Sequence, residues 1–409
     1  MEHDELGSWL RLTLTPGVGN STARKLLAAF GLPQAVFSAS AAALSQVVTA
    51  AQASALRAQP PELAALVDTT WTWLAEAGEG SAHRQIVVLG DPDYPVALLD
   101  MDDPPLMLYL LGAGKFSSKS APALVNEEYV ATKAIASEVM PRLGNCIAVV
   151  GTRNPTPQGE ANARNFSKAL GQAGLTVVSG LALGIDGAAH EGALDSVLPG
   201  SNRLATVAVV GTGLDRVYPK SHLNLAHRIA RNGLIISEYP LGTPPLTANF
   251  PKRNRIIAGL AQGTLVVEAA LKSGSLITAR LTVEQGKDVF AIPGSIHSTL
   301  ARGCHALIKQ GAKLVESAQD VLEEMQLVGE PFALADDVAV GTPLHGTPAS
   351  ASTQAILLTA LGFDPVGLDA LQARGDLDTA SLQAQLMTLE LEGLVARLPG
   401  GLFQRLVSR

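Results

Sequence analysis

The amino-acid sequence predicts an α/β protein with a doubly wound parallel sheet, a helical domain before the sheet and a winged-helix domain after it. Short apolar runs bounded by glycine alternate with helical stretches between residues 147 and 315, which is the pattern of a doubly wound sheet. Apolar residues recur at helical spacing within residues 1–80, and residues 353–409 combine helical stretches with a final hairpin pattern. Together these observations predict three folded units.

The composition allows a large core and limits the function. The chain has 409 residues, of which 47% are hydrophobic and only 4% aromatic, so the core must consist mainly of aliphatic side chains, as in buried parallel strands. The net charge of −7 excludes a uniformly basic surface for nucleic acid. Any such binding must therefore depend on a local basic patch.

The cysteines and the N-terminus indicate a cytoplasmic protein. Cys146 and Cys304 lie far apart, without a Cys/His cluster, so we expect no metal site, and isolated cysteines suit a reducing cytosol. The N-terminus is acidic and lacks a signal-peptide pattern, and no run of about 18 apolar residues occurs, so we expect no membrane span.

Residues 1–80 are predicted to form a helical domain. Gly17 and Gly19 lie in a Pro-Gly-Val-Gly loop, and a helix of residues 21–30 follows it. This arrangement resembles a helix-hairpin-helix, whose backbone amides can bind phosphate. A structural corner between two helices requires the same tight turn and is the favoured interpretation.

Residues 81–325 are predicted to form the sheet domain. An Ala- and Ser-rich segment of about residues 113–145 reads as a helical insertion without an assigned role. The apolar runs that predict parallel strands are 147–150, 175–178, 206–210, 234–237, 264–267, 289–292 and 313–315.

Residues 326–352 are predicted to be a linker, because they are rich in Gly, Pro, Ser and Thr without periodicity. Residues 353–409 then show helices over 353–361, 366–373 and 379–392, and a hairpin that turns on residues 399–401. Such a winged helix can read duplex DNA, but residues 382–392 contain no Lys or Arg and two Glu. We therefore favour a protein-contact or spacer role.

Small polar residues follow several of the predicted strands. Because parallel strands end at one edge of a sheet, these turns are expected to meet there as an anion-binding rim. Glycine and serine occupy most strand-to-helix turns in any case, so this alternative stays open. The residues of the predicted rim are Gly151, Thr152, Arg153, Ser179, Gly180, Lys220, Ser273, Gly274 and Ser275.

The segment of residues 249–255 supplies a local basic patch. Lys252, Arg253 and Arg255 fall within four positions, and no acidic residue occurs between residues 241 and 262. The segment opens a predicted helix, whose positive dipole end would lie beside these cations and Asn254. Phe250 could stack on an unpaired base, or it could belong to the core.

Other chemistries have weaker support. The sequence has no P-loop motif and only an incomplete dinucleotide motif. Asp186 and His190 share a helix face, and they are more often a cap and a packed neighbour than a catalytic pair. Glu238 and Glu268 each follow a strand and could be catalytic. The alternative is therefore a nucleotide or phosphoribosyl hydrolase on the same kind of sheet.

Several segments occur in an order that resembles the DprA/Smf DNA-processing family, over roughly residues 90–320. They are Val150-Gly151-Thr152-Arg153, the stretch 179–190 (SGLALGIDGAAH), Gly211-Thr212-Gly213-Leu214-Asp215, Tyr218-Pro219-Lys220, Ser237-Glu238-Tyr239-Pro240, the stretch 249–260 (NFPKRNRIIAGL), the stretch 273–280 (SGSLITAR), Ile292-Pro293-Gly294 and Gly311-Ala312-Lys313.

This resemblance implies an extended Rossmann-like domain that binds single-stranded DNA, forms a dimer and helps to load the RecA recombinase in natural transformation. We expect no enzymatic activity and no cofactor. It implies DNA contacts from the Gly-Thr-Arg, Tyr-Pro-Lys and Phe-Pro-Lys-Arg-Asn-Arg segments. It also implies a dimer surface in residues 303–308, with His305, Leu307 and Ile308. The N-terminal domain, of helix-hairpin-helix or SAM-like type, and the winged helix look like family accessories.

Overall fold

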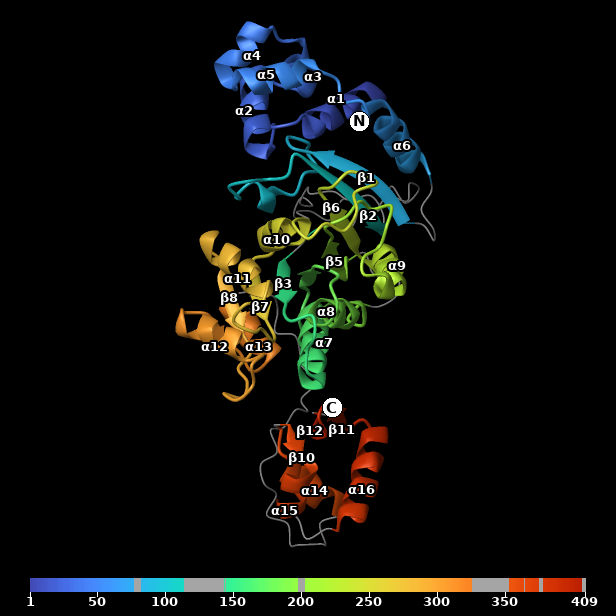
Figure 1. Ribbon diagram of the computed structural model, residues 1–409, viewed down its shortest axis with the longest axis vertical. Coiled ribbons are helices and arrows are strands. Elements are labelled where there is room, and N and C mark those ends of the chain that lie inside the picture. Colours follow the sequence, from blue (N-terminus) through green and yellow to red (C-terminus); the bar gives the residue numbers. More distant parts are fainter. Residues whose placement is uncertain are drawn as a thin grey trace, which may run out of the picture.

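The computed structural model describes residues 1–76, 82–113, 143, 145–197, 203–325, 353–363, 365–374 and 378–406 (Figure 1). Most of the predicted insertion of residues 113–145 and the whole predicted linker of residues 326–352 lie outside the described residues. The predicted fold class is confirmed, since the chain combines a large, mostly parallel sheet with helices and a C-terminal winged helix.

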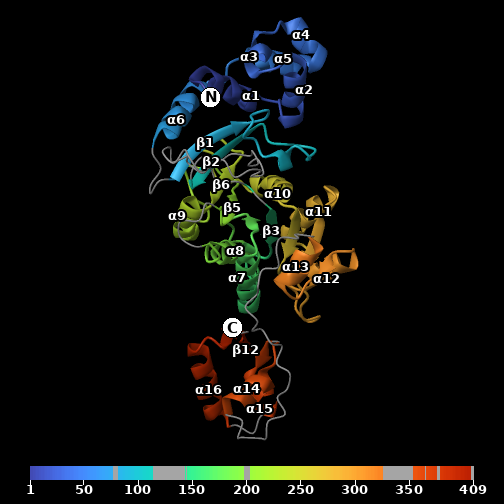
Figure 2. The ribbon, with the colours of Figure 1, turned by 180° about the vertical axis from the view of Figure 1, so that it is seen from behind.

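Six helices precede the sheet and pack at its β1–β2 end, as both faces of the molecule show (Figures 1 and 2). The turn at Gly17 and Gly19 leads into α2, and this helix faces the sheet domain. Arg24 of α2 donates from Nη1 to Oδ1 of Asp103 at 2.9 Å, so a half-exposed carboxylate from the loop before β2 lies beside the first turns of α2. The helices are α1 (His3–Leu14), α2 (Asn20–Phe30), α3 (Pro33–Ser38), α4 (Ala41–Val47), α5 (Ala50–Arg57) and α6 (Leu63–Ala75).

One sheet of nine strands has the order β1-β2-β6-β5-β4-β3-β7-β8-β9. All strands from β3 to β9 pair in parallel, close to the predicted positions. The strands are β1 (Ala82–Val88), β2 (Met107–Ala113), β3 (Cys146–Val150), β4 (Thr176–Ser179), β5 (Thr206–Val209), β6 (Leu234–Ser237), β7 (Gly263–Val266), β8 (Asp288–Ala291) and β9 (Lys313–Leu314).

The antiparallel strands β1 and β2 were not among the predicted strands, and they extend the parallel sheet at one edge. They form a hairpin, and β2 pairs antiparallel with β6. One face of this hairpin shares a hydrophobic core with the N-terminal helices, where the rings of Trp73 and Tyr109 meet edge to face at 6.1 Å. The N-terminal helices and the sheet edge are therefore packed together by apolar burial.

Alternate residues of β3 pack into two different cores, as expected for a strand buried on both faces. Ile147 and Val149 contact the cluster beneath α7 (Pro157–Gln172), α8 (Ile185–Leu194) and α13 (Ala318–Glu324). Ala148 and Val150 contact the cluster beneath α10 (Asn249–Leu260), α11 (Ser275–Glu284) and α12 (Arg302–Lys309). The helix α9 (Leu223–Asn232) packs on β5 and β6.

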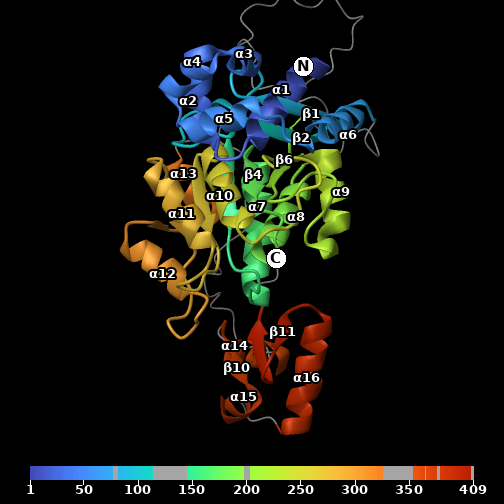
Figure 3. The same cartoon turned by 45° about the horizontal axis from the view of Figure 1, so that its top comes forward.

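The connections from β3 and β7 run in opposite directions across the sheet, because β4, β5 and β6 lie on one side of β3 and β7, β8 and β9 on the other. A crevice opens at such a switch point, outside the carboxyl ends of the strands. The helices α10 and α11 pack side by side above it (Figure 3).

The C-terminal unit is a winged helix with its own core. Val366, which was predicted to begin a helix, instead lies in the short strand β10 and pairs with Phe403 of the wing. This pairing closes a three-stranded sheet that the sequence pattern did not reveal. The elements are α14 (Thr353–Leu361), β10 (Val366–Gly367), α15 (Leu368–Arg374), α16 (Thr379–Leu391), β11 (Val395–Leu398) and β12 (Leu402–Arg405).

Candidate nucleic-acid interface

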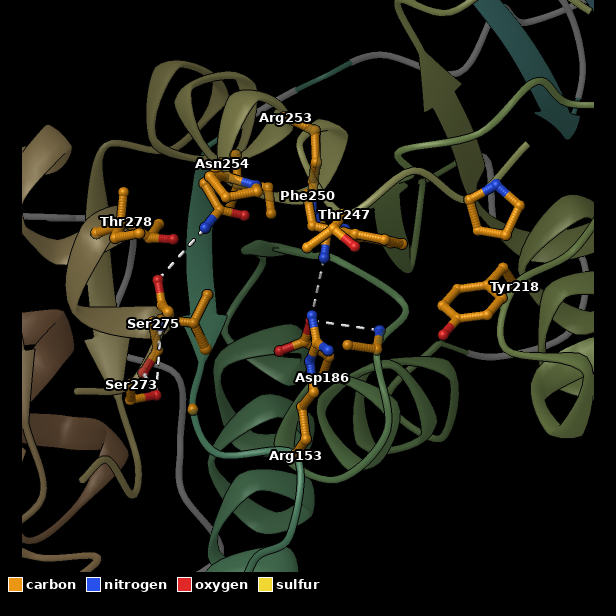
Figure 4. A pocket seen from close by; sticks show the side chains of 18 residues that line it. Arg153, Asp186, Tyr218, Thr247, Phe250, Arg253, Asn254, Ser273, Ser275 and Thr278 are labelled. Atoms are coloured by element: carbon orange, nitrogen blue, oxygen red, sulfur yellow. Dashed lines mark hydrogen bonds and ion pairs between the residues drawn. The ribbon is translucent and has the colours of Figure 1, made fainter. Parts of the chain in front are cut away.

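A pocket of about 400 Å³ lies at the switch point between β3 and β7. We call it the carboxyl-edge pocket, and Figure 4 shows its side chains. It contains eight of the fourteen residues that the sequence predicted for DNA binding: Gly151, Arg153, Phe250, Arg253, Asn254, Ser273, Gly274 and Ser275. The other lining residues are Val150, Ala182, Asp186, Tyr218, Pro245, Thr247, Pro251, Ile257, Ile277 and Thr278.

One wall of the pocket is formed by hydroxyl and amide groups. The hydroxyls of Ser273 and Ser275 share a hydrogen bond of 2.7 Å at the start of α11. Asn254 of α10 donates from Nδ2 to the carbonyl oxygen of Gly274 at 3.4 Å. These groups lie together on one side of the pocket (Figure 4), where the N-terminal end of α11 favours negative charge.

Another part of the pocket is aromatic. The ring centroids of Tyr218 and Phe250 are 5.6 Å apart, with 41° between the ring planes. The guanidinium of Arg153 lies 5.6 Å from the centroid of Phe250, within the range of a cation–π contact. Tyr218 is 45% exposed and Arg153 is also exposed, so a ligand can reach this group of three side chains.

Arg253 lies inside the protein rather than on the predicted rim. Its side chain is 5% exposed, and its Nη2 lies 3.9 Å from Oδ2 of Asp186. The guanidinium also donates to the carbonyl oxygens of Gly180 and Val209. Burial lowers the pKa of Arg253, although the Asp186 carboxylate acts in the opposite sense. We therefore assign Arg253 to the pocket floor.

Arg255, unlike Arg253, does not line the pocket. It pairs with the carboxylate of Glu238 and donates to the carbonyl oxygen of Asp103 at 2.6 Å. At the start of the same helix, Asn249 donates to the carbonyl oxygen of Gly211 at 3.0 Å. Arg255 and Asn249 thus fix α10 to the loops around it.

The Asp186 side chain occupies the turn after β4. The carboxylate of Asp186 accepts from the amide of Ala182 at 3.4 Å, and burial raises the pKa of Asp186 even though Arg253 lowers it. The hydroxyl of Ser179 donates to the carbonyl oxygen of Val149 at 2.6 Å. A Cβ at Gly180 would collide with the Arg253 guanidinium. Ser179 and Gly180 therefore support the pocket from below.

Lys220, Lys252 and Thr152 lie outside the pocket lining. Both lysines are exposed, so they remain available to phosphates. The amide of Thr152 donates to the carbonyl oxygen of Glu268 at 2.8 Å. This bond fixes the turn that carries Arg153.

The candidate catalytic carboxylates have partners within the fold. Glu268 accepts from the amide of Thr156 at 2.9 Å and from its hydroxyl at 2.6 Å, at the start of α7. Glu238 pairs with Arg255 and Asp186 faces Arg253. Within the described residues, no group of three or more His, Cys, Asp or Glu could hold a metal ion.

The predicted dimer residues lie on α12 and do not line the carboxyl-edge pocket. Leu307 and Ile308 are partly buried against the core. His305 contacts the carbonyl oxygen of Gly294 through Nε2 at 3.0 Å. An apolar groove of about 760 Å³ runs between α11 and α12, and Leu307 lines it together with the exposed Leu271 and Val283.

The sequence-based prediction of individual site residues did not include Thr247 and Thr278, and it covered Tyr218 only through the Tyr-Pro-Lys segment that the family resemblance implied. Tyr218 belongs to the Tyr-Pro-Lys segment whose lysine, Lys220, was predicted to bind DNA. An aromatic residue so close to a predicted phosphate contact could have been named as a base-stacking residue. Thr247 and Thr278 gave no comparable signal, because only the folded chain brings them to the pocket.

The fold and the pocket define a Rossmann-like protein with cationic, polar and aromatic groups outside the carboxyl ends of its strands. The model of the family "DNA recombination-mediator protein A" matches residues 136–326, and that of the "DprA winged helix domain" matches residues 342–401. The chain belongs to the DprA/Smf family of DNA-processing proteins.

Individual relatives agree with this assignment. Protein Smf of Synechocystis is 37% identical over 347 residues, which cover 79% of this chain and 80% of that protein. Protein Smf of Escherichia coli is 42% identical over 256 residues, covering 62% of this chain and 66%, just under two thirds, of that protein. The X-ray structure of DNA processing protein A from Streptococcus pneumoniae superposes with a TM-score of 0.57 at 32% identity, covering 79% of this chain and 98% of that one.

Proposed function

We propose that this protein binds single-stranded DNA without regard to base sequence, in the carboxyl-edge pocket and over the cations around it. The observation that carries the proposal is the group formed by the exposed Arg153 and Tyr218 and the half-buried Phe250 beside a polar wall. Aromatic faces stack on any base, but only where the base is unpaired. Membership of a family of DNA-processing proteins supports the same function.

Phosphate groups would be held by side chains that lie outside internal networks. Arg153, Lys220 and Lys252 are exposed, and the Ser273-Gly274-Ser275 turn offers hydroxyls beside them. Arg253 and Arg255 suit this role less well, because both already donate to partners within the protein. The acidic remainder of the surface would confine the strand to this region.

The test is a titration of a fluorescent oligonucleotide of arbitrary sequence, followed by anisotropy at several salt concentrations. The affinity of the unaltered protein should fall steeply with salt, because each neutralised phosphate releases counterions. Arg153→Ala combined with Lys252→Ala should weaken binding and reduce the salt slope. Lys25→Ala combined with Arg57→Ala removes the same charge from exposed positions of the N-terminal helices and serves as the control.

Unchanged affinity and slope in the Arg153/Lys252 variant would show that the site is wrong. A duplex of the same sequence provides a second comparison. It should bind more weakly, because its bases cannot reach Phe250 and Tyr218. Equal affinity for the duplex would contradict the stacking part of the proposal.

We also propose that the protein acts as a homodimer and loads the RecA recombinase onto DNA during natural transformation. Family membership supports both parts, and the apolar groove between α11 and α12 is a suitable protein-contact surface near Leu307 and Ile308. Mass measurement in solution tests the dimer: Ile308→Arg should give a monomer, and an unchanged dimer would rule out this interface.

A hydrolase on the same sheet is not favoured by the geometry of the carboxylates. Glu238, Glu268 and Asp186 each have partners within the protein, and a general base must be within reach of a substrate proton. Incubation with nucleoside monophosphates, followed by chromatography for free base, tests the non-enzymatic proposal. Turnover by the unaltered protein that disappears in Glu268→Gln would support the hydrolase hypothesis instead.

We propose a cytoplasmic location, because both cysteines are free thiols and the proposed partners are DNA and RecA. None of the helices in the described part of the chain combines the length and apolar character that crossing a membrane requires.

A further inference from the structure

A groove of about 440 Å³ lies in the N-terminal helical domain, where α1 packs against both α3 and α6 (Figure 1). We call it the α1 groove, and it shares no lining residue with the carboxyl-edge pocket. We propose that the α1 groove binds an extended peptide segment of a protein partner, in which an acidic residue and a basic residue lie three positions apart. This inference is independent of the proposed DNA binding.

The guanidinium of Arg11 forms a cationic end of the α1 groove. It lies over the Phe37 ring, 4.0 Å from the ring centroid, and its Nη2 donates to the carbonyl oxygen of Leu56 at 2.8 Å. Its Nε is buried without a hydrogen-bond partner, and no carboxylate in the described part of the chain pairs with Arg11. Burial lowers the pKa of Arg11, but a guanidinium stays charged at neutral pH. A carboxylate from a partner would therefore supply both the missing acceptor and the missing counter-charge.

The other end of the α1 groove is acidic. Asp4 and Asp68 are exposed, and both lie near His3, whose Nδ1 is 3.7 Å from Oδ1 of Asp4 and whose Nε2 is 3.8 Å from Oδ1 of Asp68. Because one imidazole reaches both carboxylates, a lysine or arginine of a partner can contact both as well. Asp4 and Arg11 are seven positions apart on α1, which separates the two ends by about 10 Å along the helix.

The length and the walls of the α1 groove suit an extended chain. A strand rises about 3.3 Å per residue, so two residues three positions apart are separated by about 10 Å. Between the charged ends, Gly7 faces the buried Val67, since a Cβ at Gly7 would lie 3.7 Å from Cγ2 of Val67. The side-chain amides of Gln34 and Gln59 line the groove without a hydrogen-bond partner in the described residues. They can therefore bond to the backbone of a peptide.

Charge favours a peptide over a nucleic-acid strand in this groove. The phosphates of a strand that reached Arg11 would pass close to the exposed carboxylates of Asp4 and Asp68, which repel them. The Phe37 ring is covered by Arg11, so it offers no free face to a base. A peptide with both charges complements the two ends of the groove, whereas a nucleic acid complements only one.

The probes are fluorescent hexapeptides, blocked at both ends, with Glu-Val-Val-Lys or Lys-Val-Val-Glu at their centre. The valines favour an extended chain, and the two sequences present the same charges in opposite directions. One of them should bind the full chain in an anisotropy titration. Replacing its glutamate by glutamine should weaken binding about tenfold, because a charge-assisted hydrogen bond to Arg11 is lost. Replacing its lysine by methionine should weaken binding about threefold, because the aspartates are exposed.

A steric variant identifies the groove. Ala64 of α6 is exposed and lines the α1 groove, and its neighbour Ala65 is exposed but does not line it. Ala64→Trp should abolish peptide binding and Ala65→Trp should leave it unchanged, and both variants should fold because neither alanine is buried. Asp4→Asn combined with Asp68→Asn should weaken binding of the lysine-containing peptide about threefold. The same pair of changes should leave binding of the methionine-containing peptide unaltered.

The outcomes separate this inference from the proposed function. Failure of both peptides to bind the unaltered chain would overturn the inference, and so would peptide binding that persists in a folded Ala64→Trp variant. Displacement of the bound peptide by a single-stranded oligonucleotide would assign the groove to nucleic acid and overturn it too. Ala64→Trp should bind an oligonucleotide as the unaltered chain does. If the peptide binds but no oligonucleotide does, the proposed function fails and the peptide site stands.

Discussion

The Arg253 guanidinium lies 3.9 Å from the Asp186 carboxylate, and both side chains are almost fully buried beneath the carboxyl-edge pocket. The contact joins α10 to the start of α8, while the same guanidinium binds the carbonyl oxygens of Gly180 and Val209. The pocket floor is therefore held by one arginine that connects α10 to the loop after β4 and to the end of β5.

Arg253→Met should destabilise the protein by about 3–5 kcal/mol, because it leaves the buried Asp186 carboxylate without its partner. Urea denaturation followed by circular dichroism measures this loss. Lys252→Met, at the exposed neighbouring position, should change stability by less than about 0.5 kcal/mol and weaken DNA binding instead. Equal stability of the two variants would contradict the structural role of Arg253.

His190 should make stability depend on pH. It is fully buried, and burial, with smaller effects of Arg253 and His222, lowers its pKa to about 3. Its Nε2 accepts from the amide of Leu181 at 3.3 Å, and its Nδ1 shares a bond of 2.7 Å with the Thr206 hydroxyl. The neutral ring is therefore favoured in the folded state.

Because the folded pKa lies below the unfolded value of about 6.5, this contribution is full above pH 6.5 and is lost as pH falls toward 3. Between pH 7.5 and pH 5 the loss should be about 2 kcal/mol. Urea denaturation across this range should show it in the unaltered protein and not in His190→Gln. Asp186 and Glu238, whose pKa values are raised mainly by burial, act in the opposite direction but are common to both proteins. Identical pH profiles would refute the assignment.

Glu268 should stabilise α7 rather than carry out catalysis. Its carboxylate accepts from both the amide and the hydroxyl of Thr156 at the N-terminus of that helix. Glu268→Ala should therefore lower the free energy of unfolding by about 1–2 kcal/mol, as the loss of a helix cap does. Thermal denaturation measures the change, and Glu284→Ala, at an exposed position of α11, is the control. A Glu268→Ala variant as stable as the control would contradict this role.

The sequence predicted the parallel strands well because each is a short aliphatic run, such as Ile147–Val150, that must be buried on both faces. It missed β1 because His83, Arg84 and Gln85 interrupt the apolar pattern, and the burial of this strand depends on the distant N-terminal helices. Packing across domains has no local signature in the sequence.

The cations predicted for the site lie in different environments, and the sequence could not reveal this for a similar reason. Lys252, Arg253 and Arg255 are close in sequence, but successive helical residues point in directions about 100° apart. Lys252 faces solvent, while Arg253 and Arg255 reach internal partners. Composition identifies a basic segment, but the direction of each side chain depends on where the rest of the fold places carboxylates and carbonyl groups.

The aromatic pair should contribute to DNA binding without affecting its salt dependence. Phe250→Ala and Tyr218→Ala should each weaken the binding of a single strand by about 1–3 kcal/mol, the range found for the stacking of one base. Tyr218→Phe should retain most of the affinity, because the ring and not the hydroxyl makes the contact with Phe250. Neither alanine variant removes a charge, so the slope of affinity against salt should stay the same.

Anisotropy titrations of these variants at several salt concentrations give both quantities. Trp71→Ala, which removes a partly exposed ring of α6, is the matched control and should bind as the unaltered protein does. If the slope falls in Phe250→Ala, this ring acts by holding Arg153 in place for a phosphate instead of stacking on a base. If affinity is unchanged in both alanine variants, the bases lie elsewhere and the aromatic side of the pocket has no part in binding the strand.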